Sequence, residues 1–450
     1  MKPRLNLISL LLCASASLFA EGPAVYAIHD ARVVRVSGPP LEHGTVVVRN
    51  GLIEAVGENI VPPADAWIIE GPGLTVYPGL IDALSTIGIP GAAAPSSAGP
   101  AVRGGGPRPP PAAPAAPTLS PPPPAAGPED RPSNTSFLRA ADQLVAADHS
   151  MEAARDGGFT TAVTFPTANI FAGQGVVFDL AGVRIGQMVI DPAAGQYIAL
   201  RNNGSSFPGS LMGAIAYIRQ IYLDADRYKV AKAIYDKHPK GLERPAYDRT
   251  LEGVIESPRV LLPAHRAVEI DRMLQLAREL KIKPILYGGE EAWRSVDSLK
   301  RSGVPVLVTL KWPEKAKDSD PAVNEPLRLL EMREKAPSTP GVLAKNGILF
   351  AFYSDGIATS KELLKAAKKA VDAGLSTSDA VRALTLSPAE IFGVSDRLGS
   401  IEKGKIANLV VTDGDLFADK TKVKYVFVDG NKFEPAPESP DAKKDMEKTQ

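Results

Sequence analysis

The chain has 450 residues, of which 44% are hydrophobic and 23% charged, a composition typical of a globular protein with one large and one smaller domain. Its 51 Lys and Arg residues balance its 51 Asp and Glu residues. Without an excess of positive charge, the chain is not expected to bind nucleic acid or an anionic membrane surface. Small molecules or proteins are therefore the expected partners.

The first 20 residues have the layout of a secretory signal peptide. A start containing Lys and Arg precedes an apolar run from Leu5 to Leu12, and small residues follow up to Ala20. The alternative, a transmembrane anchor, needs about 20 continuous apolar residues. We therefore predict that residues 1–20 are cleaved and that the protein is periplasmic or secreted, without a membrane segment afterwards. The single cysteine, Cys13, lies in this segment, so the mature chain would contain no disulfide and no thiolate ligand.

Alternating apolar and polar residues at both ends of the mature chain predict a small β module. Residues 24–76 contain several short runs of β-branched residues broken by Gly, Asn and Pro, and residues 398–434 contain two more. We predict that these two segments together form a composite β-sandwich. Residues 435–450 are strongly polar and are predicted to be a disordered tail.

The middle of the chain, residues 77–396, alternates between strand and helix patterns. Short apolar runs such as GFTTAVTFP, RVLLPA, KPILYGG, VPVLVTL and GILFAFYSD suit strands buried on both faces. Helical spacing follows several of them, and Gly303 is placed to end one helix before the next strand. This alternation predicts parallel βαβ units. The length favours a TIM-like (β/α)₈ barrel over an open doubly wound sheet.

Residues 90–132 do not fit a compact barrel, because they are rich in Pro, Ala and Gly and contain few large apolar side chains. We predict a disordered insert that leaves the barrel after its first strand. Its position at the mouth, where barrels keep their active sites, leaves two interpretations open. The insert is either a tolerated surface insertion or a lid or tether for a partner.

Two stretches of the chain carry a resemblance to a known family. VVVRNGLIEAVG followed by LTVYPGLID, and GLSTSDAVRALTLSPAEIFGVSDRLGSIEKGKIANLVVTDGDLF near the C-terminus, resemble the amidohydrolase superfamily and specifically its imidazolonepropionase-like branch. The resemblance spans nearly the whole mature chain. It implies a TIM-like barrel that carries metal at its C-terminal mouth, a composite β-sandwich beside it, and hydrolysis of C–N bonds in amides or cyclic amides.

The resemblance also implies particular site residues. A divalent metal lowers the pKa of bound water and polarises the carbonyl group under attack. The family aspartate that ligates this metal and transfers the proton matches Asp355 in GILFAFYSDG, and a family histidine ligand matches His265 in RVLLPAHRAVEI. From the residues alone, Asp355 is open to a second interpretation as a turn cap near Gly356. His265 is likewise open to interpretation as a partly buried loop histidine.

The chain departs from the family pattern at the metal ligands. The His-x-His of the first strand is replaced by Leu84, Ser85 and Thr86, and no histidine follows His265 to supply the sixth-strand ligand, whose place falls near residues 287–289. Neither a leucine nor a threonine replaces an imidazole ligand.

The other histidines do not complete a metal site. His29 and His43 belong to the β module, His149 to a helix pattern and His238 to a turn. A zinc site takes three or four protein ligands. We therefore expect either no metal or a single weakly held divalent ion such as zinc. Its ligands would be His265, Asp355 and a carboxylate such as Glu290 or Glu291.

Two functions follow from these observations. The first is an exported amidohydrolase-like hydrolase acting on C–N bonds, with a degenerate metal site and Asp355 as its catalytic residue. The second is a catalytically inactive binding protein, a pseudoenzyme that binds a small molecule or pairs with a metal-competent paralogue. Fold resemblance alone does not distinguish them, because function depends on the site.

Overall fold

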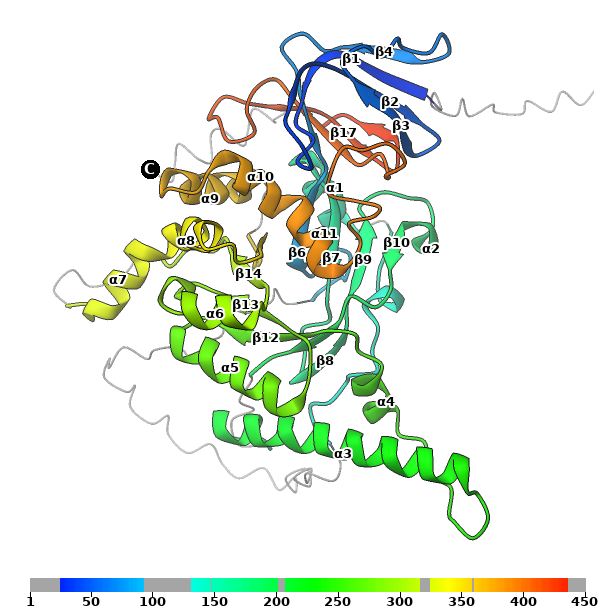
Figure 1. Ribbon diagram of the computed structural model, residues 1–450, viewed down its shortest axis with the longest axis vertical. Helices are drawn as coiled ribbons and strands as arrows, with labels where there is room; N and C mark the ends of the chain where they lie inside the picture. The colour runs from blue at the N-terminus through cyan, green and yellow to red at the C-terminus, as the bar shows by residue number, and fades with distance from the viewer. Residues whose placement is uncertain are drawn as a thin grey trace, which may run out of the picture.

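The computed structural model describes residues 25–92, 131–146, 148–200, 207–315, 324–357 and 360–435. The predicted signal peptide, nearly all of the predicted insert and nearly all of the predicted tail lie outside the described residues. Figure 1 shows an elongated molecule with a β-rich module at one end, strands through its middle and helices along one side.

The β-rich module is one eight-stranded sheet built from both ends of the chain. β16 joins the N-terminal strands by antiparallel pairing with β5, which places the blue and red strands of Figure 1 side by side. Buried β-branched side chains, among them Ile28, Val46 and Val411, form its core. The strands, in ladder order, are β18 (Asn431–Phe433), β17 (Val423–Val428), β16 (Leu409–Thr412), β5 (Thr75–Pro78), β1 (Val25–Val33), β2 (Leu41–Arg49) and β3 (Leu52–Gly57), with β4 (Trp67–Glu70) paired to β1.

Two further sheets form the middle of the molecule. The first has the order β10 (Val189–Asp191), β9 (Val176–Asp179), β7 (Phe159–Thr164) and β6 (Leu80–Ser85). The second has the order β15 (Phe350–Tyr353), β14 (Val306–Thr309), β13 (Pro284–Gly288), β12 (Val260–Ala264), β11 (Gln196–Ile198) and β8 (Phe171–Gln174). β6 and β15 contact each other across the two sheets. This arrangement, with helices outside, fits a TIM-like barrel.

The predicted parallel pairing is confirmed for most of this region, but β8 and β9, which the sequence patterns did not indicate, run antiparallel to their neighbours. β11 to β15 pair in parallel, as do β6 and β7, but β9 runs antiparallel to β7 and β8 runs antiparallel to β11. The connection from β7 to β8 spans only residues 165–170 and contains no helix. A parallel crossover needs a dozen or more residues, so this short connection returns the chain in the opposite direction.

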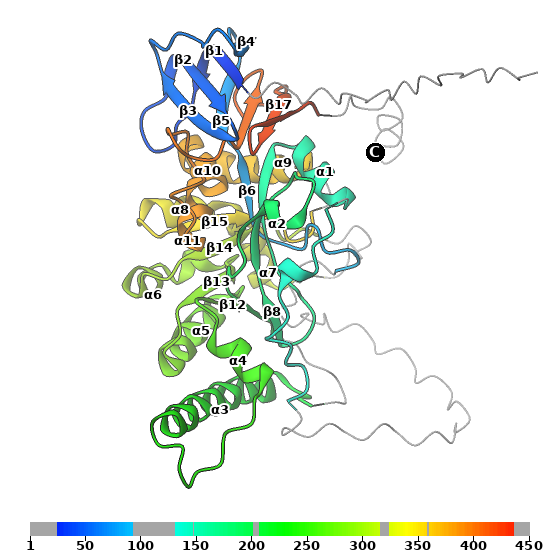
Figure 2. The same ribbon diagram turned by 90° about the vertical axis from the view of Figure 1, so that its right-hand side faces the viewer.

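The helices cover the outer side of the central strands (Figure 2). In α5, the residues Ile270, Met273, Leu274 and Ala277 recur at helical spacing and are all buried. Gly303 ends α6 in the left-handed conformation, as its position predicted. The helices are α1 (His149–Asp156), α2 (Ile185–Met188), α3 (Leu211–Lys237), α4 (Arg249–Ile255), α5 (Ala267–Leu280), α6 (Val296–Ser302), α7 (Leu327–Lys335), α8 (Thr339–Lys345), α9 (Ser360–Asp372), α10 (Thr377–Leu384) and α11 (Leu386–Phe392).

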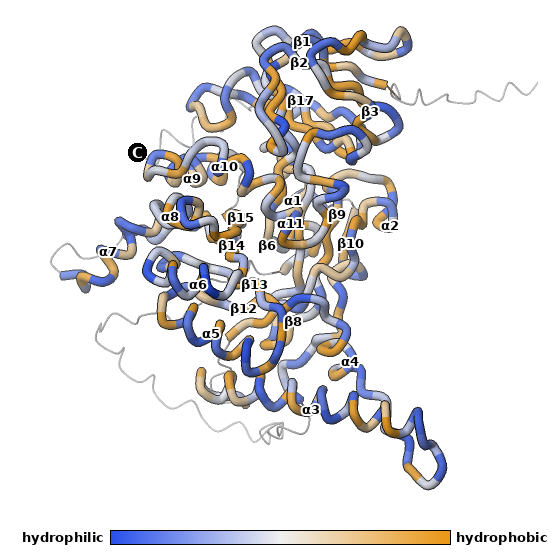
Figure 3. Tube along the Cα trace, in the orientation of Figure 1, coloured by the Kyte–Doolittle hydropathy of each residue, from blue (hydrophilic) through white to orange (hydrophobic). Residues whose placement is uncertain are grey.

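Apolar residues concentrate along the strands in the middle of the molecule (Figure 3). Strand alternation divides the central core into two parts. Leu307 and Tyr353 belong to one buried cluster, whereas Val308 and Phe352 belong to another that includes residues of the surrounding helices. Among the described helices, none combines the length and the apolar character needed to cross a membrane.

Candidate functional site

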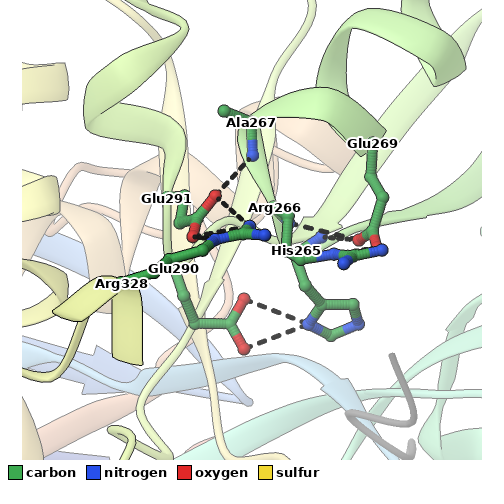
Figure 4. Close-up of polar contacts among 7 residues, drawn as sticks. All are labelled: His265, Arg266, Ala267, Glu269, Glu290, Glu291 and Arg328. Carbon is green, nitrogen blue, oxygen red and sulfur yellow. Dashed lines mark hydrogen bonds and ion pairs between the residues drawn. The ribbon is translucent and has the colours of Figure 1, made fainter. Parts of the chain in front are cut away.

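The site is built on the carboxyl ends of β12, β13, β14 and β15, which meet at one edge because these strands are parallel. His265 follows β12 directly, and its side chain faces Glu290, which follows β13 (Figure 4). Nδ1 of His265 lies 3.0 Å from both carboxylate oxygens of Glu290. His265 and Glu290 are only 8% and 9% exposed, so this contact is shielded from water.

The local backbone positions both partners. The backbone N–H of His265 donates to Oε2 of Glu269 in α5, and the backbone N–H of Glu291 donates to the carbonyl of His265. Thr339 donates from its hydroxyl to the carbonyl of Glu290. Gly288 permits the close approach of the imidazole, because a Cβ at this position would lie 2.6 Å from Nδ1 of His265. The position where the family places its sixth-strand ligand is therefore occupied by the ring of His265.

The pairing of His265 with Glu290 has two chemical consequences. Burial, the largest single effect, lowers the pKa of His265, but the carboxylates of Glu290, Glu269 and Asp355 outweigh it and leave the pKa above its usual value. With Nδ1 donating to Glu290, the other ring nitrogen, Nε2, is the one available to exchange a proton. A carboxylate that orients a histidine in this way is a common device in hydrolytic sites.

Asp355 lies at the end of β15 in a tight turn closed by the N–H of Ile357 and the carbonyl of Ser354. Its backbone φ is 48°, in the left-handed region that non-glycine residues rarely adopt, and its side chain is only 1% exposed. Oδ2 accepts a 3.4 Å hydrogen bond from the hydroxyl of Thr309, whereas Oδ1 has no partner within the described residues. Asp355 is therefore part of a turn. A residue that only caps a turn does not need a buried carboxyl group with one oxygen lacking a hydrogen-bond partner.

Burial raises the pKa of Asp355 to about 7. The positive charges of Lys311 and His265 oppose this rise, the charge of Glu290 adds to it, and the hydrogen bond from Thr309 opposes it. The same surroundings raise the pKa of Tyr353 through burial and the nearby charges of Asp355 and Glu290, so the phenol stays protonated. A carboxyl group with a pKa near neutrality exchanges protons readily at physiological pH.

The first strand reaches this site through Asp82. Its Oδ1 accepts hydrogen bonds from the backbone N–H groups of Ser354 at 3.1 Å and of Leu84 at 3.4 Å. Burial raises the pKa of Asp82 to about 6, and the hydrogen bonds from Ser354 and Leu84 oppose the rise. Leu84, at the first ligand position of the family motif, is fully buried among apolar side chains. The segment that carries the family motif thus holds the end of β15 through Asp82, whereas Leu84 at the ligand position has no donor atom for a metal.

The donor groups around the site do not fit a firmly held metal. Across the described residues, no cluster of three or more His, Cys, Asp or Glu side chains is arranged to hold an ion. Glu290 is occupied by His265, and Glu291 accepts from the guanidinium of Arg328 and from the backbone N–H of Ala267 (Figure 4). Neither carboxylate is therefore free to complete a ligand set with His265 and Asp355.

A cavity of about 340 Å³ lies beside the end of β6 and the turn of Asp355. Asp82, Ser85, Thr86, Ser354 and Gly356 contribute to its wall. Oδ2 of Asp82 has no hydrogen-bond partner in the described part of the chain. The size of the cavity suits a small organic molecule.

The remaining histidines lie away from this cluster. His29 contacts Thr45, and His43 contacts Asp30, within the β module. The side chain of His149 is fully exposed at the start of α1, and His238 caps the end of α3. Their positions agree with their interpretation as residues outside the site.

Comparison with known proteins finds similar sequences and folds among amidohydrolases. The amidohydrolase family model matches residues 267–432. An amidohydrolase from Thermotoga maritima MSB8 superimposes with a TM-score of 0.70 at 27% identity, over 91% of this chain and 100% of that chain. A Xaa-Pro dipeptidase crystallised with bound methionine superimposes with a TM-score of 0.54 at 17% identity, over 91% of this chain and 100% of that chain. The chain is therefore similar to amidohydrolases in sequence over residues 267–432 and in fold over most of its length.

A shorter match concerns a curated protein. N-acetylglucosamine-6-phosphate deacetylase from Haemophilus influenzae is 49% identical over 53 residues, which are 12% of this chain and 13% of the deacetylase. The chain thus aligns with only a small part of that relative.

Sequence reasoning named His265 and Asp355 but missed how the site is completed. Glu290 was considered as a metal ligand, whereas the structure pairs it with His265. Thr309 and Lys311, at the end of β14, were not considered. Residues 308–311, VTLK, lie at the end of β14, in register with the ends of β13 and β15. This strand-end position could have indicated that Thr309 and Lys311 belong to the site.

Proposed function

We propose that this protein is a hydrolase of C–N bonds in amides or cyclic amides whose acid–base chemistry comes from His265 and Asp355 rather than from a firmly held zinc ion. The observation that carries this proposal is the buried contact of His265 with Glu290 beside Asp355, at the strand ends where barrel enzymes keep their active sites. The similarity to amidohydrolases supports the bond type.

Each group has a definite part in this reaction. Nε2 of His265 would remove a proton from water while the water oxygen attacks the carbonyl carbon, and Glu290 would stabilise the resulting imidazolium. Asp355 would give its proton to the leaving nitrogen as the C–N bond breaks. The products are a carboxylic acid and an amine, and one water is consumed. The protein returns to its starting state when the imidazolium of His265 loses its proton and the carboxylate of Asp355 regains one, directly or through solvent.

We further propose that the two central sheets close into one barrel and that the chain is exported after loss of residues 1–20. The contact between β6 and β15 supports the first statement, and the sequence of the N-terminus supports the second. The alternative function is a pseudoenzyme that binds a small molecule or a metal-competent paralogue, and the unusual replacement of the family ligands by Leu84 and Thr86 favours it.

The test combines metal analysis with turnover. Protein lacking residues 1–20 is dialysed, its zinc content is measured, and hydrolysis of a panel of amides and cyclic amides is followed. We expect substoichiometric zinc and turnover that is lost in Asp355→Asn and His265→Gln. The matched control is His149→Gln, because that side chain is fully exposed and distant from the site.

Two outcomes would contradict the proposal. One zinc per chain together with zinc-dependent turnover would show that a metal performs the chemistry. Ligand binding without any turnover across the panel would favour the pseudoenzyme.

A further inference from the structure

Lys311 lies at the same edge as His265 and Asp355 but has no assigned role. It follows β14 by two residues, and strand alternation predicts that it faces the same side as Leu307 and Thr309. Leu307 belongs to the buried cluster that contains Tyr287 and Tyr353. Val308 and Leu310, which alternate with these residues, face the side of the surrounding helices.

The opposite orientation of the neighbouring residues supports this placement. Leu310 and Trp312 belong to the cluster that includes the surrounding helices, and Nε1 of Trp312 donates to the carbonyl of Ala366 in α9 at 2.8 Å. Trp312 therefore anchors the segment against a helix. By the same alternation, the side chain of Lys311 is expected to point away from that helix, toward the strand ends of the site.

Thr309 links the lysine to the catalytic carboxyl group. The backbone N–H of Lys311 donates to Oγ1 of Thr309 at 3.0 Å, and the same hydroxyl donates to Oδ2 of Asp355. The charge of Lys311 is also among the effects that lower the pKa of Asp355, which places the ammonium group within electrostatic reach of that carboxyl. Lys311 is exposed and forms no ion pair with any described residue, so its donors are available.

We propose that Lys311 forms an oxyanion-binding subsite, in which its ammonium group holds the negatively charged oxygen that develops on the substrate carbonyl and remains on the carboxylate product. This role rests on the proposed hydrolysis of C–N bonds. In the family, the positive charge at this stage belongs to a metal ion, whereas here the donor set does not fit one. A fixed cation close to a developing oxyanion stabilises it, and such donors contribute strongly to catalysis. Lys311 is thus a catalytic residue, and the ligand class is a small oxyanion.

The subsite is tested by binding, which does not depend on turnover. Inorganic phosphate is titrated into the protein by isothermal calorimetry, with Lys311→Met as the test variant and Lys300→Met as its control. Lys300 is an exposed lysine of α6, and it has no ion-pair partner in the described part of the chain. We expect Lys311→Met to weaken phosphate binding about tenfold or more, which corresponds to the loss of one charged contact. Lys311→Arg retains the charge and should keep most of the affinity.

A second variant separates this inference from the proposed function. Asp355→Asn removes a carboxyl group that repels the anion when it is ionised, so it should strengthen phosphate binding above about pH 7 while abolishing turnover. If the protein shows no turnover but its phosphate binding depends on Lys311, the subsite is supported and the proposed hydrolase activity is refuted. Equal phosphate binding by wild type, Lys311→Met and Lys300→Met would overturn the subsite. If turnover is present, Lys311→Met should lower kcat about 100-fold, and an unchanged kcat would also overturn it.

Discussion

Gly288 offers a direct test of how the site is built, because the imidazole of His265 packs against its bare Cα. Gly288 has a φ of +111°, and a Cβ there would lie 2.6 Å from Nδ1 and 2.9 Å from Cε1 of His265. Real Cβ atoms do not approach other atoms this closely. In Gly288→Ala, the ring must therefore move away or the backbone must shift.

The expected cost has two parts. The positive φ alone costs about 1–3 kcal/mol for a residue with a side chain. Displacing the ring by about 1 Å would break its 3.0 Å contacts with Glu290 and leave a buried carboxylate without its hydrogen-bond partner, which costs about 1.5–3 kcal/mol more. Gly374→Ala isolates the first part, because Gly374 has a φ of +106° and no described atom lies within 4 Å of the point that its Cβ would occupy.

Denaturant unfolding of the two variants and the wild type measures the difference. Gly288→Ala should be less stable than Gly374→Ala by about 2 kcal/mol, since only it disturbs His265. The chain has five histidines, so nuclear magnetic resonance of the ring protons can identify the His265 signal by comparison with His265→Gln. Equal losses of stability in both variants, with an unshifted His265 signal in Gly288→Ala, would refute the reasoning.

Three further predictions concern buried polar groups. Burial raises the pKa of Asp179 to about 7, so the folded chain binds this proton more tightly than the unfolded chain does. The stability that this provides is present below about pH 4 and is lost as the pH rises to about 7. The unfolding free energy of Asp179→Asn should therefore gain about 4 kcal/mol relative to wild type between about pH 4 and 8, and a pH-independent difference would contradict this. Thr309→Val removes the hydroxyl that joins Lys311 to Asp355 and should lower the unfolding free energy by about 1–2 kcal/mol with loss of turnover; unchanged thermal unfolding and activity would count against the link. Glu291→Gln loses its ion pair with the half-exposed Arg328, so we expect a fall of no more than about 1 kcal/mol and unchanged phosphate binding, which calorimetry checks; weakened phosphate binding would show that Glu291 belongs to the site.

Much of the fold follows from local patterns in the sequence. β-branched runs bounded by Gly and Pro indicated the strands, and the spacing of Ile270 and Met273 indicated α5. Parallel strands bring their carboxyl ends to one edge whatever their separation in sequence, so residues such as His265 and Asp355 were expected to share an edge. The antiparallel course of β8 and β9 was not foreseen, because only the length of the preceding connection signals it.

Only the tertiary structure decided which side chains contact one another in the site. The sequence determined that Leu84 and Thr86 replace family ligands, since side-chain chemistry alone decides that a leucine offers no donor. It did not determine that Glu290 faces His265, because the choice between neighbouring carboxylates depends on strand register and on the direction of each side chain. The close packing of His265 on Gly288 and the burial of Asp355 likewise arise only when separate strands meet, and burial is what raises the pKa of that carboxyl group.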